Sequence, residues 1–547
     1  MREIIRDNEK KILVLLCLVI LILMGVLCAF RTNMKFTGKP KGTYTSLSPD
    51  TSNDDPLAYI GEDFSVKEGF HTNLPIVILN LDSELPDYKT FKDSKEIVEE
   101  GVDPYTTGKI RIIDTETGTN TLKDSSVYES LIKIKTKGHS SYYYDKQQYK
   151  IKALNADGSS NDTSILGMGA GSEWVINGSM ADKSMIRNYL AYRIASEIDG
   201  NNMAPDSRFC EVMMERDGQL YYQGVFLLME TVSRGEDRVN IDKYNPKNIY
   251  SSYIVRRDRY TSFDIMLNTY GRLNNIGKEN AEDSDNWIGL KYPSASKVTP
   301  ETINYIEKDF SKVESILYSE DERKFRIYDK YINVDSFVDY FLINEYFGNY
   351  DAGEHSTYMY KSSGDVLSIG PVWDYDQAMN NSWTDELITE DIAFQTQPFF
   401  RELANDKKFI KKLKERYAEL SSSYLSLDHV FDVIDETVAY LNSAQKREWY
   451  RWADDYLDGS GENPKNYNLE AYLKDGVLLQ RFNDDYEEEI NVIKKFFYEH
   501  STVIQNDLTQ WMGVSKYDTS VGSISELLFL AMLTMLLLPS YLIQRKG

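Results

Sequence analysis

Cysteine is scarce in this sequence, with three residues in a chain of 547. Cys17 and Cys28 lie in an apolar run, so Cys210 is the one thiol of the polar body. This count excludes a disulfide-stabilised scaffold and a cysteine-rich zinc module. We expect Cys210 to be a buried thiol without a reactive role.

Positive charge is also in deficit. The chain has 62 Lys and Arg against 86 Asp and Glu, which gives a formal net charge of −24. A nucleic-acid partner is therefore not expected, because such proteins neutralise phosphates with cations. The mean hydropathy of −0.47 excludes a polytopic transporter. The hydrophobic share of 41% nevertheless predicts a folded body with a core.

Several common catalytic motifs are missing. The sequence has no Gly-x-x-x-x-Gly-Lys-Ser/Thr loop, no His-Glu-x-x-His, no Gly-x-Ser-x-Gly and no Cys-x-x-Cys pair. Any enzymatic chemistry must therefore come from another arrangement of side chains.

Two uncharged apolar runs, residues 12–30 and 527–543, are long enough to suggest membrane crossings. Basic residues precede the first run, and Arg545 and Lys546 follow the second, as is typical of cytoplasmic flanks. The pattern predicts a protein of the cell membrane with two transmembrane helices, both termini cytoplasmic and the main domain extracytoplasmic. The alternatives are a cleaved signal peptide at the first run and a buried C-terminal helix at the second.

Between these runs, the pattern changes from strands to helices. Alternating or β-branched segments, such as residues 74–81, 130–136 and 149–152, predict strands, whereas helical periodicity begins after Pro300. We expect an α+β fold with two lobes. The expected domains are a cytoplasmic stub and anchor (1–30), a linker (31–63), a strand-rich N-lobe (64–230), a helical C-lobe (231–515) with an insertion at 260–300, and a C-terminal transmembrane helix with its tail (524–547).

Acidic residues gather at the ends of short apolar segments between residues 344 and 381. Asp351 follows a helix rich in aromatic residues, and Asp374 and Asp376 belong to a Trp-Asp-Tyr-Asp sequence. Such carboxylates suit a hard divalent cation, and a further carboxylate can orient or deprotonate a hydroxyl nucleophile. The alternative is that Asp351 caps a helix and the later residues form a turn.

A lysine-rich stretch, residues 135–152, has the pattern of a strand, a Gly/Ser turn and a second strand. Backbone N–H groups in such a turn can hold phosphate oxygens, and a lysine on the strand can neutralise them. The alternative is that these lysines form a solvated strand edge.

Together these segments resemble the CotH kinase family, named for spore-coat protein H. The likeness covers roughly residues 74–507. Its motifs are Leu-Pro-Ile-Val-Ile at residue 74, the turn 137–141 with the strand 146–152, residues 166–191, and Asn-Tyr-Asp at 349 with Trp-Asp-Tyr-Asp at 373. The combination is specific to the family, although no single motif is.

The resemblance implies an atypical protein-kinase-like fold. It also implies an enzyme that uses ATP and Mg²⁺ (or Mn²⁺) to phosphorylate extracytoplasmic Ser/Thr hydroxyls. Together with the two apolar runs, this predicts a membrane-anchored kinase of cell-envelope proteins. The site residues that it implies are Asp351 as the catalytic carboxylate, Asp374, Asp376 and Ser356 around the metal, Lys146 or Lys152 with Gly138 and Ser140 at the nucleotide phosphates, and Glu230 near the adenine edge.

Three positions depart from the family pattern. Lys137 stands where arginine is usual, Gln147 where a second lysine is common, and Ser356 where a kinase catalytic loop has a metal-binding asparagine. They keep open a catalytically weak, kinase-like scaffold or assembly factor of the cell surface. A transferase acting on glycan or polyphosphate-linked envelope polymers is a further alternative. The acidic composition favours a basic protein segment as substrate.

Overall fold

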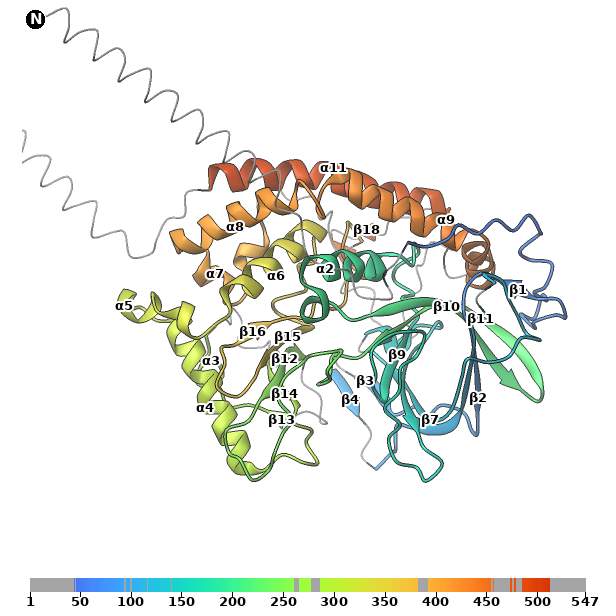
Figure 1. Cartoon of the computed structure of the whole chain (residues 1–547), viewed down its shortest axis with the longest axis horizontal. Helices are drawn as coiled ribbons and strands as arrows, with labels where there is room; N and C mark the ends of the chain where they lie inside the picture. The colour runs from blue at the N-terminus through green and yellow to red at the C-terminus, as the bar shows by residue number, and fades with distance from the viewer. Residues whose placement is uncertain are drawn as a thin grey trace, which may run out of the picture. The chain divides into compact units, whose positions relative to one another are not determined.

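In the computed structural model, seven strands from the first part of the chain close into a barrel (Figure 1). β2 and β10 pair in parallel, and the other neighbours are antiparallel. The strands, in barrel order, are β10 (Ser207–Arg216), β11 (Gln219–Glu230), β9 (Glu173–Asn177), β8 (Gln148–Leu154), β7 (Tyr128–Lys137), β5 (Thr106–Ile113) and β2 (Ile76–Leu81).

The alternation along each strand separates the barrel interior from its outer face. Ile132 and Ile134 of β7 and Ile151 of β8 point inward and pack with Trp174 in the barrel core. Cys210 belongs to the same core and is buried, as expected. The lysines between these apolar residues therefore lie on the outside of the barrel.

The structure describes most of the chain between residues 44 and 511. The described residues are 44, 46–92, 95–98, 101–115, 117–138, 140–259, 265–276, 286–381, 392–453, 456, 473–474, 477–478 and 485–511.

A second sheet follows the barrel in sequence. Its strands, in spatial order, are β13 (Ile265–Met266), β14 (Asn286–Tyr292), β12 (Tyr253–Arg259), β15 (Thr357–Lys361) and β16 (Ser368–Ile369). β13 and β14 come from the stretch that we expected to be an irregular insertion. Strands are therefore not confined to the first lobe, and the expected division into a strand-rich and a helical lobe is incomplete.

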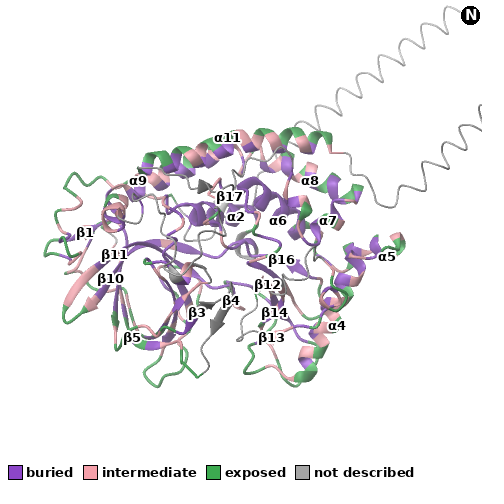
Figure 2. Ribbon diagram, turned by 180° about the vertical axis from the view of Figure 1, so that it is seen from behind, coloured by how far each residue is buried: buried purple, intermediate pink, exposed green. Residues whose placement is uncertain are grey.

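Helices, most of them from the second half of the chain, cover the rest of the described body. The helical character expected after Pro300 is confirmed, and Figure 2 shows the buried and exposed faces of these helices. Polar N-cap side chains fix where several of them begin, as Asn333 does for α6 and Asp485 for α11. The helices are α2 (Arg187–Met203), α3 (Tyr270–Leu273), α4 (Pro300–Leu317), α5 (Glu322–Phe325), α6 (Val334–Phe347), α7 (Phe400–Leu403), α8 (Lys407–Leu420), α9 (Leu427–Arg451) and α11 (Tyr486–Gln510).

Short elements complete the described chain. They are the strand pairs β1 (His71–Thr72) with β6 (Asn120–Thr121), β3 (Lys89–Lys92) with β4 (Lys95–Val98) and β17 (Leu473–Lys474) with β18 (Val477–Leu478), and the 3₁₀ turns η1 (Ser140–Tyr143), η2 (Tyr328–Lys330) and η3 (Phe394–Thr396).

The expected flanking transmembrane helices are not supported, and this part of the predicted fold class and location is corrected. Within the described part of the chain, no helix has both the length and the apolar character needed to cross a bilayer. The long helices there are amphipathic: α11 buries Ile493 and Phe497 but carries three glutamates in its first turn. The apolar runs 12–30 and 527–543 lie outside the described residues.

Part of the expected linker is packed against the body. The backbone N–H of Asp50 donates to Ala439 O of α9 over 3.0 Å, and Asp50 Oδ2 accepts from the backbone N–H of Ser443 over 2.9 Å. The hydroxyl of Tyr44, which is 1% exposed, donates to Pro205 O over 2.9 Å. These hydrogen bonds link the segment that contains Tyr44 and Asp50 to α9 and to the residues just before β10.

Candidate active site

Asp351 lies in the turn that follows α6. The helix ends at Gly348 in a left-handed conformation, with φ 63°. A side chain there would meet the ring of Phe496 of α11, because a Cβ would lie 2.6 Å from it. The backbone N–H of His355 donates to Asp351 O over 2.9 Å and closes the next turn. The end of α6 therefore fixes the backbone that carries Asp351.

Asp374 and Ser356 meet in space, although 18 residues separate them in sequence. The hydroxyl of Ser356 donates to Asp374 Oδ2 over 3.0 Å. Asn349, two residues before Asp351, donates from Nδ2 to Asp374 O over 3.2 Å. The structure thus joins the segment after α6 to the segment after β16.

Burial and the charges of neighbouring carboxylates raise the pKa values of two of these side chains. The side chain of Asp351 reaches solvent, but protein atoms surround it on its other sides, and this partial burial raises its pKa to about 7 against the opposing pull of Arg259. Burial also raises the pKa of Asp376 well above its usual value, and the charges of Asp374, Asp182 and Asp351 add to the effect. These groups are close enough to repel one another when all are ionised.

The oxygen donors fit a divalent cation such as Mg²⁺. Asp374, Asp376 and Ser356 offer two carboxylates and a hydroxyl, and a cation there would relieve the repulsion between the carboxylates. Within the described ranges, no three His, Cys, Asp or Glu residues could hold a metal among themselves. Two carboxylates and a hydroxyl suit an ion such as Mg²⁺, which keeps water and phosphate oxygens among its ligands.

Lys137, at the end of β7, lies opposite the acids. Its Nζ is 5.7 Å from the centre of the Trp373 ring. Burial lowers the pKa of Lys137, and the nearby carboxylates of Asp374 and Asp376 oppose this shift. The end of the barrel strand and the acidic loop therefore form two sides of one site.

Three cross-strand pairs carry lysines along the outer face of β7 and β8. The register places Lys137 opposite Gln148, Lys135 opposite Lys150, and Lys133 opposite Lys152. Since alternate residues share a face, these pairs form a row of cations that begins at the acidic loop. We call Lys135, Lys137, Lys150 and Lys152 the lysine row.

Glu173 of β9 forms ion pairs with two members of the lysine row. Its carboxylate pairs with Lys150 over 2.8 Å and with Lys152 over 3.0 Å. Burial works against the charge of Glu173, but the two ammonium groups outweigh it and lower its pKa to about 2. Burial lowers the pKa of Lys135 to about 8, with further contributions from Lys150 and two other lysines.

Lys146 has a different environment. Its Nζ donates to Glu448 Oε1 of α9 over 2.6 Å and to Val225 O over 2.8 Å, and both side chains of the ion pair are 0% exposed. The structure therefore does not bring Lys146 to the acidic loop, whereas Lys152 belongs to the lysine row.

Gly138 and Ser140 form the turn that leads from β7 into η1. Gly138 has φ 130°, and a Cβ there would lie 2.1 Å from Ser141 Oγ. Lys89 Nζ donates to Gly138 O over 2.8 Å. This turn adjoins Lys137, at the end of β7.

Glu230 points into the fold. Its carboxylate accepts from the backbone N–H groups of Gly169, over 3.0 Å, and of Asp206, over 2.9 Å. These contacts join β11 to the glycine-rich segment before β9.

Lys135, Lys137, Lys150 and Glu173 were not among the residues predicted for the site. The signal was present in the alternation of lysines at every second position of β7 and β8, which indicates one shared face. Glu173 gave no comparable signal, because only strand pairing shows that it lies beside both lysines.

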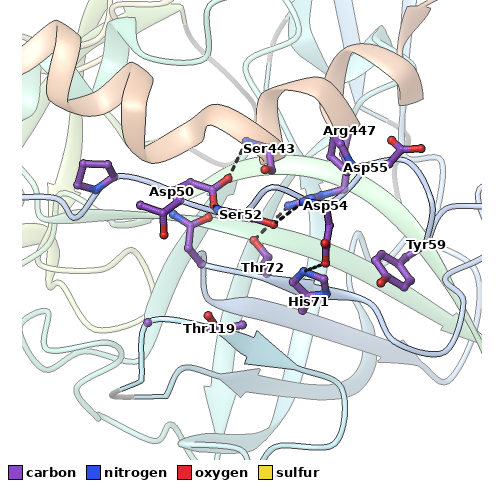
Figure 3. A pocket seen from close by; sticks show the side chains of 15 residues that line it. Asp50, Ser52, Asp54, Asp55, Tyr59, His71, Thr72, Thr119, Ser443 and Arg447 are labelled. Carbon is purple, nitrogen blue, oxygen red and sulfur yellow. Dashed lines mark hydrogen bonds and ion pairs between the residues drawn. The ribbon is translucent and has the colours of Figure 1, made fainter.

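A pocket of about 290 Å³ lies elsewhere, between the N-terminal segment, β1 and α9 (Figure 3). Asp50, Asp54, His71 and Arg447 are among its lining residues. Asp54 pairs with His71 over 3.4 Å, and Arg447 donates to Glu211 over 2.7 Å. None of the predicted site residues lines this pocket, so it is distinct from the site around Asp374.

A comparison with models of known protein families matches the part of the chain that contains the site. A family model described as CotH kinase protein matches residues 134–504. This span contains the lysine row, Asp351, Ser356 and both acids of the later loop. No curated protein matches the chain.

Proposed function

The chain belongs to the CotH kinase family and has a kinase-like function, and from this we propose that it transfers the γ-phosphate of ATP to a Ser or Thr hydroxyl of a protein. One observation carries the proposal: Asp351, Asp374 and Ser356 converge on one side of a site that has Lys137 on the other. Carboxylates for a metal and cations for phosphates are the parts that phosphoryl transfer requires.

Asp351 is the proposed acceptor of the proton. During transfer, the hydroxyl oxygen of the acceptor forms a bond to the γ-phosphorus, the bond from that phosphorus to the ADP oxygen breaks, and the hydroxyl proton passes to Asp351. A pKa of about 7 leaves a large fraction of Asp351 ionised at neutral pH and makes it an effective general base.

Asp374, Asp376 and Ser356 are the proposed ligands of the divalent ion, which neutralises charge on the phosphates when bound. Lys137 lies close enough to Asp374 and Asp376 for their charges to act on it, and it would contact the γ-phosphate. Lys135, Lys150 and Lys152 extend along the barrel and would contact the remaining phosphates. Their side chains start from rigid strands, which favours a fixed geometry of the nucleotide.

The proposed acceptor is a basic protein segment. The chain has a formal net charge of −24, and Asp258 and Glu354 add negative potential beside Asp351. Long-range attraction would raise the rate of encounter with a cationic substrate. Equal phosphorylation of matched acidic and basic peptides would contradict this part of the proposal.

Ser356 favours a second candidate, a kinase-like scaffold that binds nucleotide without transferring phosphate. Its hydroxyl is engaged by Asp374, and serine supplies a weaker metal ligand than asparagine. ATP binding without any labelled product would favour this candidate.

The direct test uses the full chain with γ-labelled ATP and Mg²⁺ or Mn²⁺, with and without a basic acceptor protein. Asp351→Asn and Asp374→Ala should abolish labelling while the fold is retained. Asp365→Asn is the matched control, because Asp365 is exposed in the turn before β16. Unchanged labelling in the first two variants would refute the roles assigned to these residues.

A further inference from the structure

Helix α2 carries polar side chains into the interior of the protein. It packs against β10, α6 and α9, and Asn188 and Tyr192 are each 1% exposed. Buried polar groups are normally hydrogen-bonded. The hydrogen-bond partners of Asn188 and Tyr192 therefore indicate which backbone segment these side chains stabilise.

A chain of hydrogen bonds runs from α2 to the acidic loop. The backbone N–H of Asp374 donates to Tyr192 Oη over 3.1 Å, and the Tyr192 hydroxyl donates to Asn188 Oδ1 over 3.0 Å. The same oxygen accepts the backbone N–H of Tyr375 over 2.7 Å. Two side chains thus satisfy two successive backbone N–H groups of the loop.

These contacts hold Asp374 in an unusual conformation. Its φ is 68°, in the left-handed region that non-glycine residues rarely occupy. The ring of Tyr192 lies 6.3 Å from that of Trp373 and 6.2 Å from that of Tyr375. The residues before and after Asp374 are therefore packed against the same side chain that binds its N–H.

Arg187 fixes the other end of the loop. Its Nε donates to Ala378 O over 3.1 Å and its Nη2 to Met379 O over 3.4 Å. The guanidinium also pairs with Asp182 over 2.5 Å, which neutralises an acid that would otherwise add to the charge near Asp376. The first two turns of α2 therefore hold the loop at both ends.

We infer that Tyr192 and Asn188 are positioning residues that direct the carboxylate of Asp374 toward the divalent cation. The inference rests on the proposed function, because it assumes that Asp374 binds this cation. Loss of either side chain leaves a buried backbone N–H without its acceptor and lets Asp374 relax from the left-handed region. The carboxylate then turns away from Ser356, and affinity for the cation falls.

Tyr192→Phe is the sharpest test, because it deletes the hydroxyl and keeps the ring. Mn²⁺ is the probe, and its dissociation constant is measured by calorimetry with the full chain. The expected weakening is about 10-fold, in the range for a buried donor left unpaired. Tyr189→Phe is the matched control, because Tyr189 lies on the same helix and its ring packs against Phe209 and Tyr44.

Hydrogen exchange provides a readout that does not depend on the metal. The amides of Asp374 and Tyr375 should exchange at least about 10-fold faster in Tyr192→Phe than in the wild type and the Tyr189→Phe control. If Tyr192→Phe does not fold, Asn188→Leu replaces it in the test, because leucine has a similar shape but no hydrogen-bond acceptor. The amides of Asp374 and Tyr375 should then exchange faster in Asn188→Leu than in the wild type.

The outcomes separate the two proposals. A wild type that binds no Mn²⁺ would refute the metal site of the proposed function, and exchange would still decide whether α2 holds the loop. A wild type that binds Mn²⁺, with equal affinity and equal exchange in Tyr192→Phe, would overturn the positioning role alone.

Discussion

Ser356 and Asp374 lie side by side in the candidate site, joined by a 3.0 Å hydrogen bond from the serine hydroxyl to Asp374 Oδ2. Both residues have a left-handed backbone, with φ 48° and 68°. Each such conformation costs roughly 1–3 kcal/mol and persists only where the surroundings enforce it. Two residues with this strained backbone in direct contact are the basis for testing whether their oxygens act together at the metal.

Replacing Ser356 by asparagine should strengthen the site. Asparagine tolerates the left-handed region better than serine, and its amide oxygen is a good ligand for Mg²⁺. We expect the Mg²⁺ concentration for half-maximal phosphotransfer to fall several-fold in Ser356→Asn. Ser363→Asn, at an exposed position, is the control; an equal response in both variants would contradict a role of residue 356 at the metal.

Asp351 should control the pH dependence of phosphotransfer. The base must be ionised to accept a proton, and its pKa is raised to about 7, so the rate should rise from pH 6 to 8 and then level off. Asp351→Asn should lose roughly 10²–10⁴-fold in kcat, the usual contribution of a general base. A variant that retains the wild-type rate would remove Asp351 from the mechanism.

The same raised pKa predicts a gain in stability for Asp351→Asn without metal. The folded protein holds this proton up to about pH 7, whereas the unfolded chain releases it near pH 4. Ionisation therefore destabilises the wild type increasingly between these values and constantly above them. Thermal unfolding should show a more stable variant at pH 8 and equal stabilities near pH 4; a less stable variant at pH 8 would contradict the crowding of this carboxyl.

Lys135 and Lys150 should contribute to ATP affinity. We expect about 10-fold weaker binding in Lys135→Met and in Lys150→Met, as for loss of a charge-assisted contact. Lys109→Met, an exposed position on β5, should bind as the wild type does. Because the pKa of Lys135 is about 8, wild-type affinity should also fall above pH 8, and this fall should be smaller in Lys135→Met.

Lys146 should matter for stability rather than for ATP. Lys146→Met leaves the buried carboxylate of Glu448 without its partner, which costs about 3–5 kcal/mol. Urea unfolding should show this loss, and a second change, Glu448→Gln, should recover part of it by removing the charge. Weaker ATP binding at unchanged stability would instead assign Lys146 to the phosphates.

The local elements were largely predictable from the sequence, because they depend on periodicity and capping. Helix α6 is the aromatic-rich helix expected before Asp351, and the acidic residues were identified from the short apolar segments that precede them. Closure of the barrel was not predictable, since β2 and β10 pair in parallel across more than a hundred residues of chain. The lysine row was accessible in principle, but its pairing with Glu173 depends on that closed sheet.

Two expectations failed for physical reasons. The polar stretch 260–300 was read as irregular, yet β13 and β14 use partners in the second sheet to form strands that local composition does not indicate. The flanking membrane helices expected from the length and charge of the apolar terminal runs are not supported, because no helix of the described residues is long and apolar enough to cross a bilayer. The two runs themselves lie outside the described residues.

The most direct test is a crystal structure of the full chain with Mn²⁺ and a non-hydrolysable ATP analogue, in which anomalous scattering locates the metal. The account predicts one Mn²⁺ site bound by Asp374 and Asp376, with the phosphates between that ion and the lysine row. A nucleotide bound in another part of the protein, or a metal that contacts neither carboxylate, would contradict it.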